Sequence, residues 1–95
     1  MAEWTRWDED EYVRYLQCER RRYAWVMRRY GNLDASQAEM AAEAQYPFEA
    51  SNAPYRGLVF HREAWDRAMR KIHGDAYWIS HPHLLHEPAE YRALD

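Results

Sequence analysis

Apolar residues in the first third of the chain recur at intervals of three and four residues. This spacing places them on one face of an α-helix, and it predicts a helix that begins at Asp8 or Glu9 and ends at Tyr30. Acidic residues fill its first turn and two arginines its last, as the helix dipole favours. Gly31 follows directly, where a left-handed residue commonly ends a helix. The expected buried face consists of Tyr12, Leu16, Tyr23, Val26, Met27 and Tyr30.

A second helix is predicted after a short connection. Ser36 and Glu39 have the spacing of a capping box, which opens a helix by pairing each side chain with a backbone N–H group. Pro47 disfavours helical geometry at the residue before it, so this helix should end near Gln45. Small apolar residues would allow a bulkier helix to approach closely. The expected apolar face consists of Ala38, Met40, Ala41 and Ala44.

A third helix is predicted from about Arg62 to His73. Gly74 then ends it by the same reasoning as the glycine after the first helix. Turn-forming residues precede it, followed by a brief apolar run at residues 58–60. That run is either a short strand or a segment docked on the core. The expected buried stripe of the third helix consists of Ala64, Trp65, Ala68, Met69 and Ile72.

The last twenty residues contain several prolines and histidines and no long periodic stretch. Pro88 has the position that proline favours at the start of a helix, which predicts a short terminal helix. The pattern as a whole predicts a mainly α fold. We expect a small globular three-helix domain, formed by residues 1–95 as one unit, with an irregular, packed C-terminal segment.

Composition changes the picture of what fills the core. Five Trp, eight Tyr and two Phe make up 16% of the 95 residues, whereas Leu, Ile and Val are scarce. Each buried Trp or Tyr removes roughly 150–250 Å² from water, so a few rings replace many aliphatic side chains. The formal net charge of −3 is too small to indicate disorder.

The composition also bears on location. Cys18 is the only cysteine, which excludes an internal disulfide and fits a reducing compartment. The N-terminal residues lack the apolar core of a signal peptide, and no apolar run approaches the length of a membrane span. We therefore expect a soluble, cytoplasmic protein with no membrane partner.

The first helix carries a second unusual face, opposite its apolar stripe. A helical wheel groups Arg14, Cys18, Arg21, Trp25 and Arg28 within about 40° of that direction. The Trp is conspicuous because a solvated face normally carries no large ring. The local charge is also strongly positive, with six arginines against one glutamate between residues 14 and 31.

Three interpretations of this face remain open. In the first, Trp25 packs against the C-terminal tail or against Trp4 and Trp7, and arginine stems cover it. In the second, Arg14, Arg21, Trp25 and Arg28 bind another protein or a second copy of the chain, because Arg and Trp dominate binding hot spots. The third is nucleic acid, which the net acidic charge disfavours.

Four of the five histidines lie between residues 73 and 86. The spacing of His81, His83 and His86 would allow three imidazoles and a water to bind zinc, with hydrolytic chemistry as one outcome. The spacing matches no recognised zinc signature, and histidines that cap turns or lie solvated in a loop are the favoured explanation. A response to pH near the ordinary pKa of histidine is the simpler expectation.

No catalytic or cofactor-binding motif is present in the sequence. Cys18 falls in the middle of the first helix, away from the helix N-terminus that lowers a thiol pKa, so a packed thiol is the simpler interpretation. The sequence therefore favours a non-enzymatic protein–protein interaction module without a cofactor. The alternative is a metal-binding protein that uses the histidine cluster.

Overall fold

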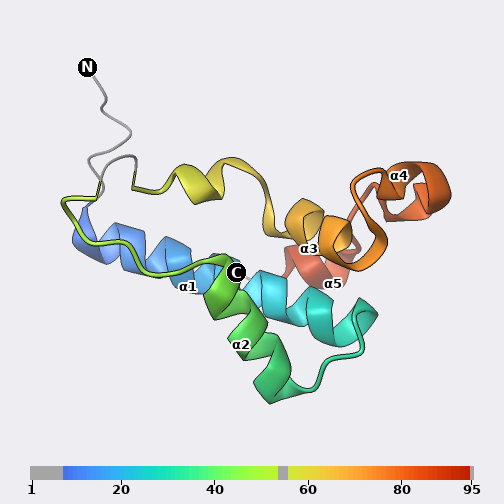
Figure 1. Ribbon diagram of the computed structural model, residues 1–95, viewed down its shortest axis with the longest axis horizontal. Coiled ribbons are helices and arrows are strands. Elements are labelled where there is room, and N and C mark those ends of the chain that lie inside the picture. The colour runs from blue at the N-terminus through green and yellow to red at the C-terminus, as the bar shows by residue number, and fades with distance from the viewer. Residues whose placement is uncertain (1–7, 54–55, 95) are drawn as a thin grey trace.

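The computed structural model describes residues 8–53 and 56–94, which form a mainly helical structure with no strand in those ranges. In chain order the elements are α1 (Glu9–Tyr30), α2 (Ala35–Gln45), the 3₁₀ helix η2 (Leu58–His61), α3 (Ala64–His73), α4 (Tyr77–Ser80), the 3₁₀ helix η3 (Pro82–Leu84) and α5 (Ala89–Arg92). Figure 1 shows the longest helix, α1, running between α2 and α3; α2, α3 and α5 contact it, whereas α4 lies farther away and contacts α3 and η3. The mainly α fold class is confirmed.

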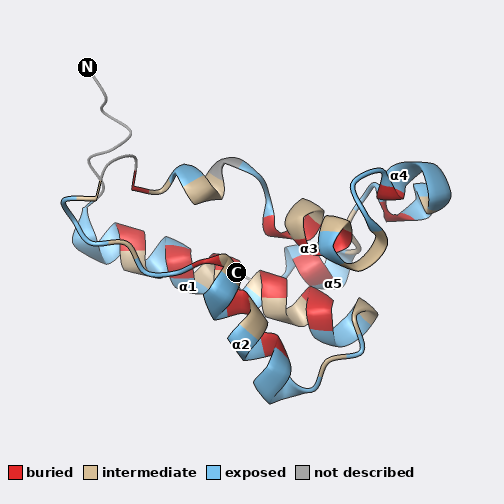
Figure 2. Cartoon of the chain, in the orientation of Figure 1, coloured by how far each residue is buried: buried red, intermediate tan, exposed pale blue. Residues whose placement is uncertain are grey.

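Helix α1 has the predicted bounds. The Asp8 carboxylate accepts a hydrogen bond from the backbone N–H of Glu11 at 3.3 Å and so caps the first turn. The expected apolar face is buried, except that Tyr30 is only half-buried. Glu19 lies on the same face and is 3% exposed. Figure 2 shows these buried positions as a row along the inner side of α1, where the core lies.

The end of α1 differs from the sequence-based expectation. Gly31 has φ −101° rather than a left-handed value, and its N–H donates to the Met27 carbonyl oxygen at 2.9 Å. The left-handed position is Asn32, with φ 61°. Asparagine tolerates this region better than most residues. The chain reversal therefore lies one residue later than predicted.

Helix α2 opens with a capping box, but not the predicted one. The Asp34 carboxylate accepts from the backbone N–H of Gln37 at 2.8 Å, and the Gln37 side chain accepts from the backbone N–H of Asp34 at 3.1 Å. The prediction of Ser36 and Glu39 was therefore wrong by two residues. Aspartate and glutamine satisfy the same backbone groups as serine and glutamate, so either pair could form the box.

The buried face of α2 also differs from the prediction. Ala38 and Ala42 are buried one turn apart, whereas Met40 is 67% exposed and Ala44 is exposed. Ala41 is half-buried. Met40 lies about 200° around the helix from Ala38, so it cannot share that face. Two alanines at the contact allow α2 to lie close to α1.

Helix α3 confirms the predicted stripe. Ala64, Trp65, Ala68 and Met69 are buried, and Ile72 is half-buried. The helix begins two residues later than expected. Because the Glu63 side chain does not cap it, the first turn depends on a group from elsewhere in the chain.

One such group is the Tyr91 hydroxyl. Its oxygen accepts a hydrogen bond from the backbone N–H of Trp65 at 3.0 Å, in the first turn of α3. The Trp65 indole N–H donates to the Leu84 carbonyl oxygen at 2.8 Å. The Trp65 ring also meets the rings of Tyr91 and Tyr30 edge to face, with centroids 5.4 and 5.6 Å apart. One side chain thus joins α1, α3, η3 and α5.

The segment after α2 runs back along α1 toward its N-terminal end (Figure 1). The Tyr12 hydroxyl on α1 accepts from the backbone N–H of Glu49 at 2.9 Å. Arg56 is buried, its guanidinium lies 3.9 Å from the centre of the Tyr12 ring, and it donates to the Glu9 carboxylate at 3.0 Å. The apolar run that follows is the 3₁₀ helix η2, with Phe60 against the core, so it is a docked segment and not a strand.

The C-terminal segment is irregular and packed, as predicted. Tyr77, Leu84 and Tyr91 each place a buried side chain on the core, one from each of its three short helices. Pro88 does not occupy the first helical position but the N-cap of α5, with φ −74° and ψ 165°. The missing N–H group of proline is harmless at either position, which is why the sequence could not separate them.

Candidate interaction surface

The four residues predicted as a binding surface lie on the outward side of α1. Arg14, Arg21 and Arg28 are exposed, and Trp25 is half-buried. The arginines are seven residues apart, so two helical turns bring each back to nearly the same direction. We call Arg14, Arg21, Trp25 and Arg28 the Arg/Trp face.

Three of these residues line a groove between α1, α2 and the C-terminal turn. The groove has a volume of about 460 Å³, and Arg21, Trp25 and Arg28 border it on α1. Its other borders include Glu39 and Glu43 on α2, Leu94 in the C-terminal turn, and also Gln17, Arg20, Ala24, Ala35 and Ala42.

Arg14 lies apart from that groove. It lines a neighbouring hollow of about 650 Å³ on the other side of the exposed face, together with Cys18 and Arg22. Gln17 and Arg21 line both spaces, so the hollow adjoins the groove along α1. The structure therefore arranges the four predicted residues along two adjoining depressions.

Trp25 makes the contact that the first interpretation of this face required. Its ring centroid lies 6.1 Å from that of Tyr91 and 6.3 Å from that of Tyr30, both edge to face. The Arg29 guanidinium lies 5.9 Å from the ring centre. Trp25 thus packs on the C-terminal tail, and its remaining surface borders the groove. Trp4 and Trp7, the other predicted neighbours, lie outside the described residues.

The arginines of α1 divide into two groups. Arg20 donates inward to the Tyr46 carbonyl oxygen at 2.9 Å, and Arg22 pairs with Glu19 at 3.3 Å. By contrast, Arg14 and Arg28 form no ion pair within the described part of the chain, and Arg21 reaches only the Leu94 carbonyl oxygen, at 3.2 Å. The exposed side of α1 therefore carries three arginines that form no ion pair with another described residue.

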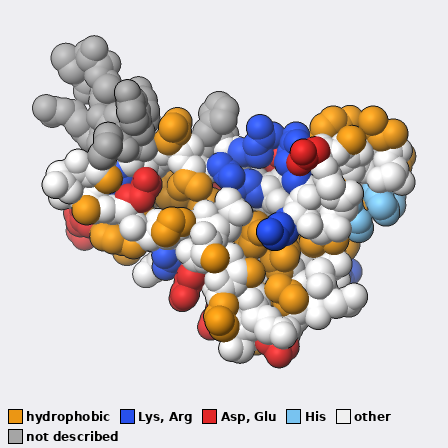
Figure 3. Space-filling model, viewed as in Figure 1, with side chains coloured by type: hydrophobic (Ala, Val, Ile, Leu, Met, Phe, Trp, Pro, Cys, Tyr) orange, Lys and Arg blue, Asp and Glu red, His pale blue; other side chains and the backbone are white. Residues whose placement is uncertain are grey.

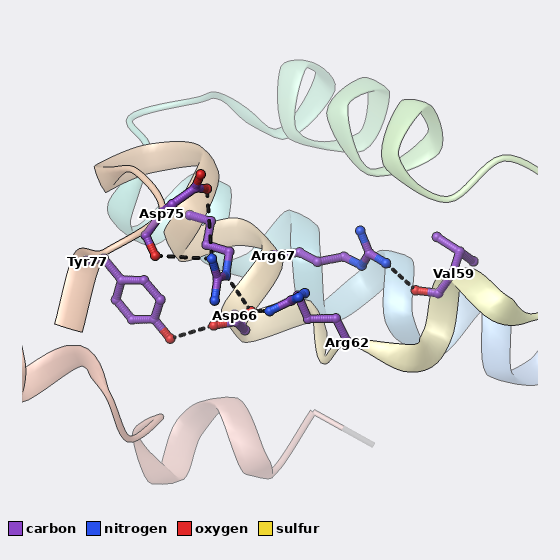
Figure 4. Close-up of polar contacts among 7 residues, drawn as sticks. Val59, Arg62, Asp66, Arg67, Asp75 and Tyr77 are labelled. Carbon is purple, nitrogen blue, oxygen red and sulfur yellow. Dashed lines mark hydrogen bonds and ion pairs between the residues drawn. The ribbon is translucent and has the colours of Figure 1, made fainter.

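A second group of basic residues lies at the junction of η2 and α3, and Asp66 pairs with two of them. Figure 3 shows lysine and arginine side chains gathered where η2 meets α3. Figure 4 shows Asp66 at the centre of this group, accepting from Arg62 at 3.0 Å, Arg70 at 2.8 Å and the Tyr77 hydroxyl at 3.0 Å. Although burial opposes ionisation, these hydrogen bonds hold the pKa of Asp66 below its ordinary value. Sequence spacing offered a signal for part of this network, since Arg62, Asp66 and Arg70 are four residues apart.

The histidines assemble differently from the prediction. The rings of His73 and His81 lie 4.1 Å apart, and that of His83 lies 6.1 Å from His81. Burial lowers the pKa of His73, and the nearby His81 and His83 lower it further. Residues 8–53 and 56–94 contain no group of three or more His, Cys, Asp or Glu residues placed to hold a metal ion. His73 was not among the predicted ligands, and the chain reversal after α3 brings it beside His81.

Within the described ranges, no helix combines the length and the apolar character needed to cross a membrane. Comparison with protein-family models, with curated proteins and with solved structures finds no match to this chain.

Proposed function

We propose that this chain is a non-enzymatic protein–protein interaction module that binds an acidic segment of a protein through the Arg/Trp face. One observation carries the proposal. Arg21 and Arg28 have no carboxylate partner among the described residues and border a groove together with the half-buried Trp25. Arg14, which also has no such partner, lines the adjoining hollow. This arrangement offers both positive charge and an apolar surface to a ligand.

The chemistry of these side chains favours a carboxylate-bearing ligand. A guanidinium group binds a carboxylate through two parallel hydrogen bonds, which adds geometric specificity to the attraction. An indole supplies a large rigid surface at little cost in conformational entropy, and Trp and Arg are enriched among the residues that dominate binding energy. The groove border provided by Trp25 and Ala24 would receive an apolar side chain of the ligand.

One feature disfavours nucleic acid on the same face. The chain as a whole has a net charge of −3, whereas nucleic-acid-binding domains usually carry a basic excess.

A defined probe peptide tests the proposal. The probe is a synthetic helical peptide with glutamates three and four residues apart around a single phenylalanine, and its binding is followed by NMR of the labelled protein. We expect shifts at the Trp25 indole and at the neighbouring amides of α1. Arg28→Glu should weaken binding about tenfold or more, because one attraction becomes a repulsion.

Lys71→Glu is the matched control. It makes the same charge reversal at an exposed residue of α3, away from the groove, and should leave the affinity for the probe within about twofold. A probe that does not bind, or one whose affinity falls equally in both variants, would refute the proposal.

A further inference from the structure

Regularly spaced residues continue along the exposed side of α1 beyond the four of the Arg/Trp face. Its outward positions alternate in steps of three and four residues, the spacing of a helix that packs against another helix along a seam. We call this set the outward seam: Glu11, Arg14, Cys18, Arg21, Trp25 and Arg28. Four of the six side chains are exposed, and Cys18 and Trp25 are half-buried.

The outward seam is charge-polarised along the helix. Its N-terminal end carries Glu11, next to the exposed Asp8 and Asp10, and its remaining charges are all arginines. Reversing one copy brings the acidic end of its seam against the basic end of the other, and two-fold symmetry repeats this contact.

Reversal places the six positions of the outward seam opposite one another in pairs. When two α1 helices lie antiparallel, with the two-fold axis passing between residues 19 and 20, Glu11 of one copy lies opposite Arg28 of the other. Arg14 then lies opposite Trp25, and Cys18 opposite Arg21. In the same register, the exposed Asp10 of one copy lies opposite the exposed Arg29 of the other, beside the seam. Each contact occurs twice, as two-fold symmetry requires.

We propose that the acidic segment bound by the Arg/Trp face is the beginning of α1 in a second copy of this chain, so that two copies form an antiparallel α1–α1 dimer. This inference rests on the proposed function, since it names the partner of the same face. In the dimer, Arg28 gains a carboxylate, and Arg14 gains an aromatic ring to stack on. These are two of the groups that the described part of the single chain leaves unpaired.

The same charges exclude the parallel arrangement. In a parallel pair in register, Arg14, Arg21 and Arg28 would each face their own copy, and three repulsions would replace the attractions. The dimer should be weak, since the outward seam is short and polar and α2 and the C-terminal turn border the groove beside it. We therefore expect dissociation in the micromolar range and a clear dependence on salt.

A charge-swap experiment tests the dimer, with sedimentation equilibrium of the whole chain as the readout. Glu11→Arg alone and Arg28→Glu alone should each weaken self-association about tenfold or more, because like charges then face each other. The double variant should restore the affinity to near that of the original chain. An equimolar mixture of the two single variants should also associate, because Arg at 11 then faces Glu at 28 and both original charges remain matched. Lys71→Glu serves as the control.

A thiol crosslinker gives a second readout. Opposed in this register, the two Cys18 residues are offset by about 4.5 Å along the helices and separated by about 8–10 Å across them. A short bis-maleimide should therefore link two copies covalently at Cys18, and Arg28→Glu should suppress the linked product.

The outcomes separate the dimer from the proposed function. A chain that is monomeric up to about 1 mM, or a dimer insensitive to the swaps, would overturn the dimer. If a monomeric chain still binds the acidic probe at Trp25, the proposed function stands without the dimer. If the probe also fails to bind, both are wrong. A dimer that the probe dissociates supports both.

Discussion

Replacing Tyr91 with phenylalanine removes one oxygen atom from the N-terminal end of α3. That oxygen accepts the backbone N–H of Trp65 at 3.0 Å, in a turn that the Glu63 side chain does not cap. The ring itself should keep its place, since Phe has the same shape and the edge-to-face contacts with Trp65 and Trp25 do not require the hydroxyl. The substitution therefore isolates one hydrogen bond.

The structure sets the size of the effect. Trp65 is 2% exposed and Tyr91 is 4% exposed, so water cannot readily replace the lost acceptor. A buried donor left without a partner costs about 1–3 kcal/mol. For a domain of this size each kcal/mol lowers Tm by about 4–8 °C. We expect Tyr91→Phe to lower the free energy of unfolding by about 1–3 kcal/mol.

Tyr46 provides the matched control. Its side chain is fully buried, but its hydroxyl has no hydrogen-bond partner among the described residues. Tyr46→Phe removes the same atom without breaking a bond, and it also removes an uncompensated buried polar group. We expect its free energy of unfolding to be unchanged or higher by about 1 kcal/mol.

Urea unfolding followed by circular dichroism measures both variants. The expected result is a lower midpoint for Tyr91→Phe and an equal or higher midpoint for Tyr46→Phe, with the same slope as the original chain. Equal losses in the two variants would show that the hydroxyl of Tyr91 does not cap α3, and the reasoning would be wrong.

Two further predictions concern the histidine cluster and α2. Burial and the neighbouring histidines hold the pKa of His73 below its ordinary value near 6.5, so the unfolded chain binds more protons and stability should fall as pH drops through that value. His81→Asn removes one of the repelling groups and should raise the pKa of His73 in an NMR titration; an unchanged pKa would contradict the cause. At the contact of α2 with α1, Ala42→Leu should cost about 1–3 kcal/mol in urea unfolding through overpacking. Met40→Leu on the exposed side should change stability by less than about 0.5 kcal/mol, and similar losses in both would place the contact elsewhere.

Much of the fold could be predicted because α1 and α3 carry clear periodicity. Large apolar residues recur on one face of each, and the stripe from Ala64 to Met69 is buried as expected. The errors occur where the local signal was ambiguous. Gly31 and Asn32 both tolerate a left-handed turn, and two overlapping pairs of residues could cap α2. Met40 was assigned to the core for its apolar character, although its angle on the helix points outward.

The candidate surface could be predicted only in part. Helix geometry alone places Arg14, Arg21, Trp25 and Arg28 opposite the buried face, and the structure confirms that the arginines are exposed. Spacing along one helix carries no information on what α2 and the C-terminal turn contribute. The groove beside Trp25 and its contact with Tyr91 depend on residues far apart in the chain, which pack together only in the folded protein.

The hydrogen bonds of Trp65 have a consequence for synthesis. A chain growing on the ribosome exposes its N-terminal residues first. Among the described residues, the acceptors of the Trp65 backbone and indole N–H groups are on Tyr91 and Leu84, which are added well after it. Until residue 91 has emerged, the backbone N–H of Trp65 lacks its acceptor, and the indole lacks its carbonyl oxygen until residue 84 has emerged. The nascent protein should therefore complete its core late in translation, and a stalled, shorter chain would present this tryptophan to chaperones.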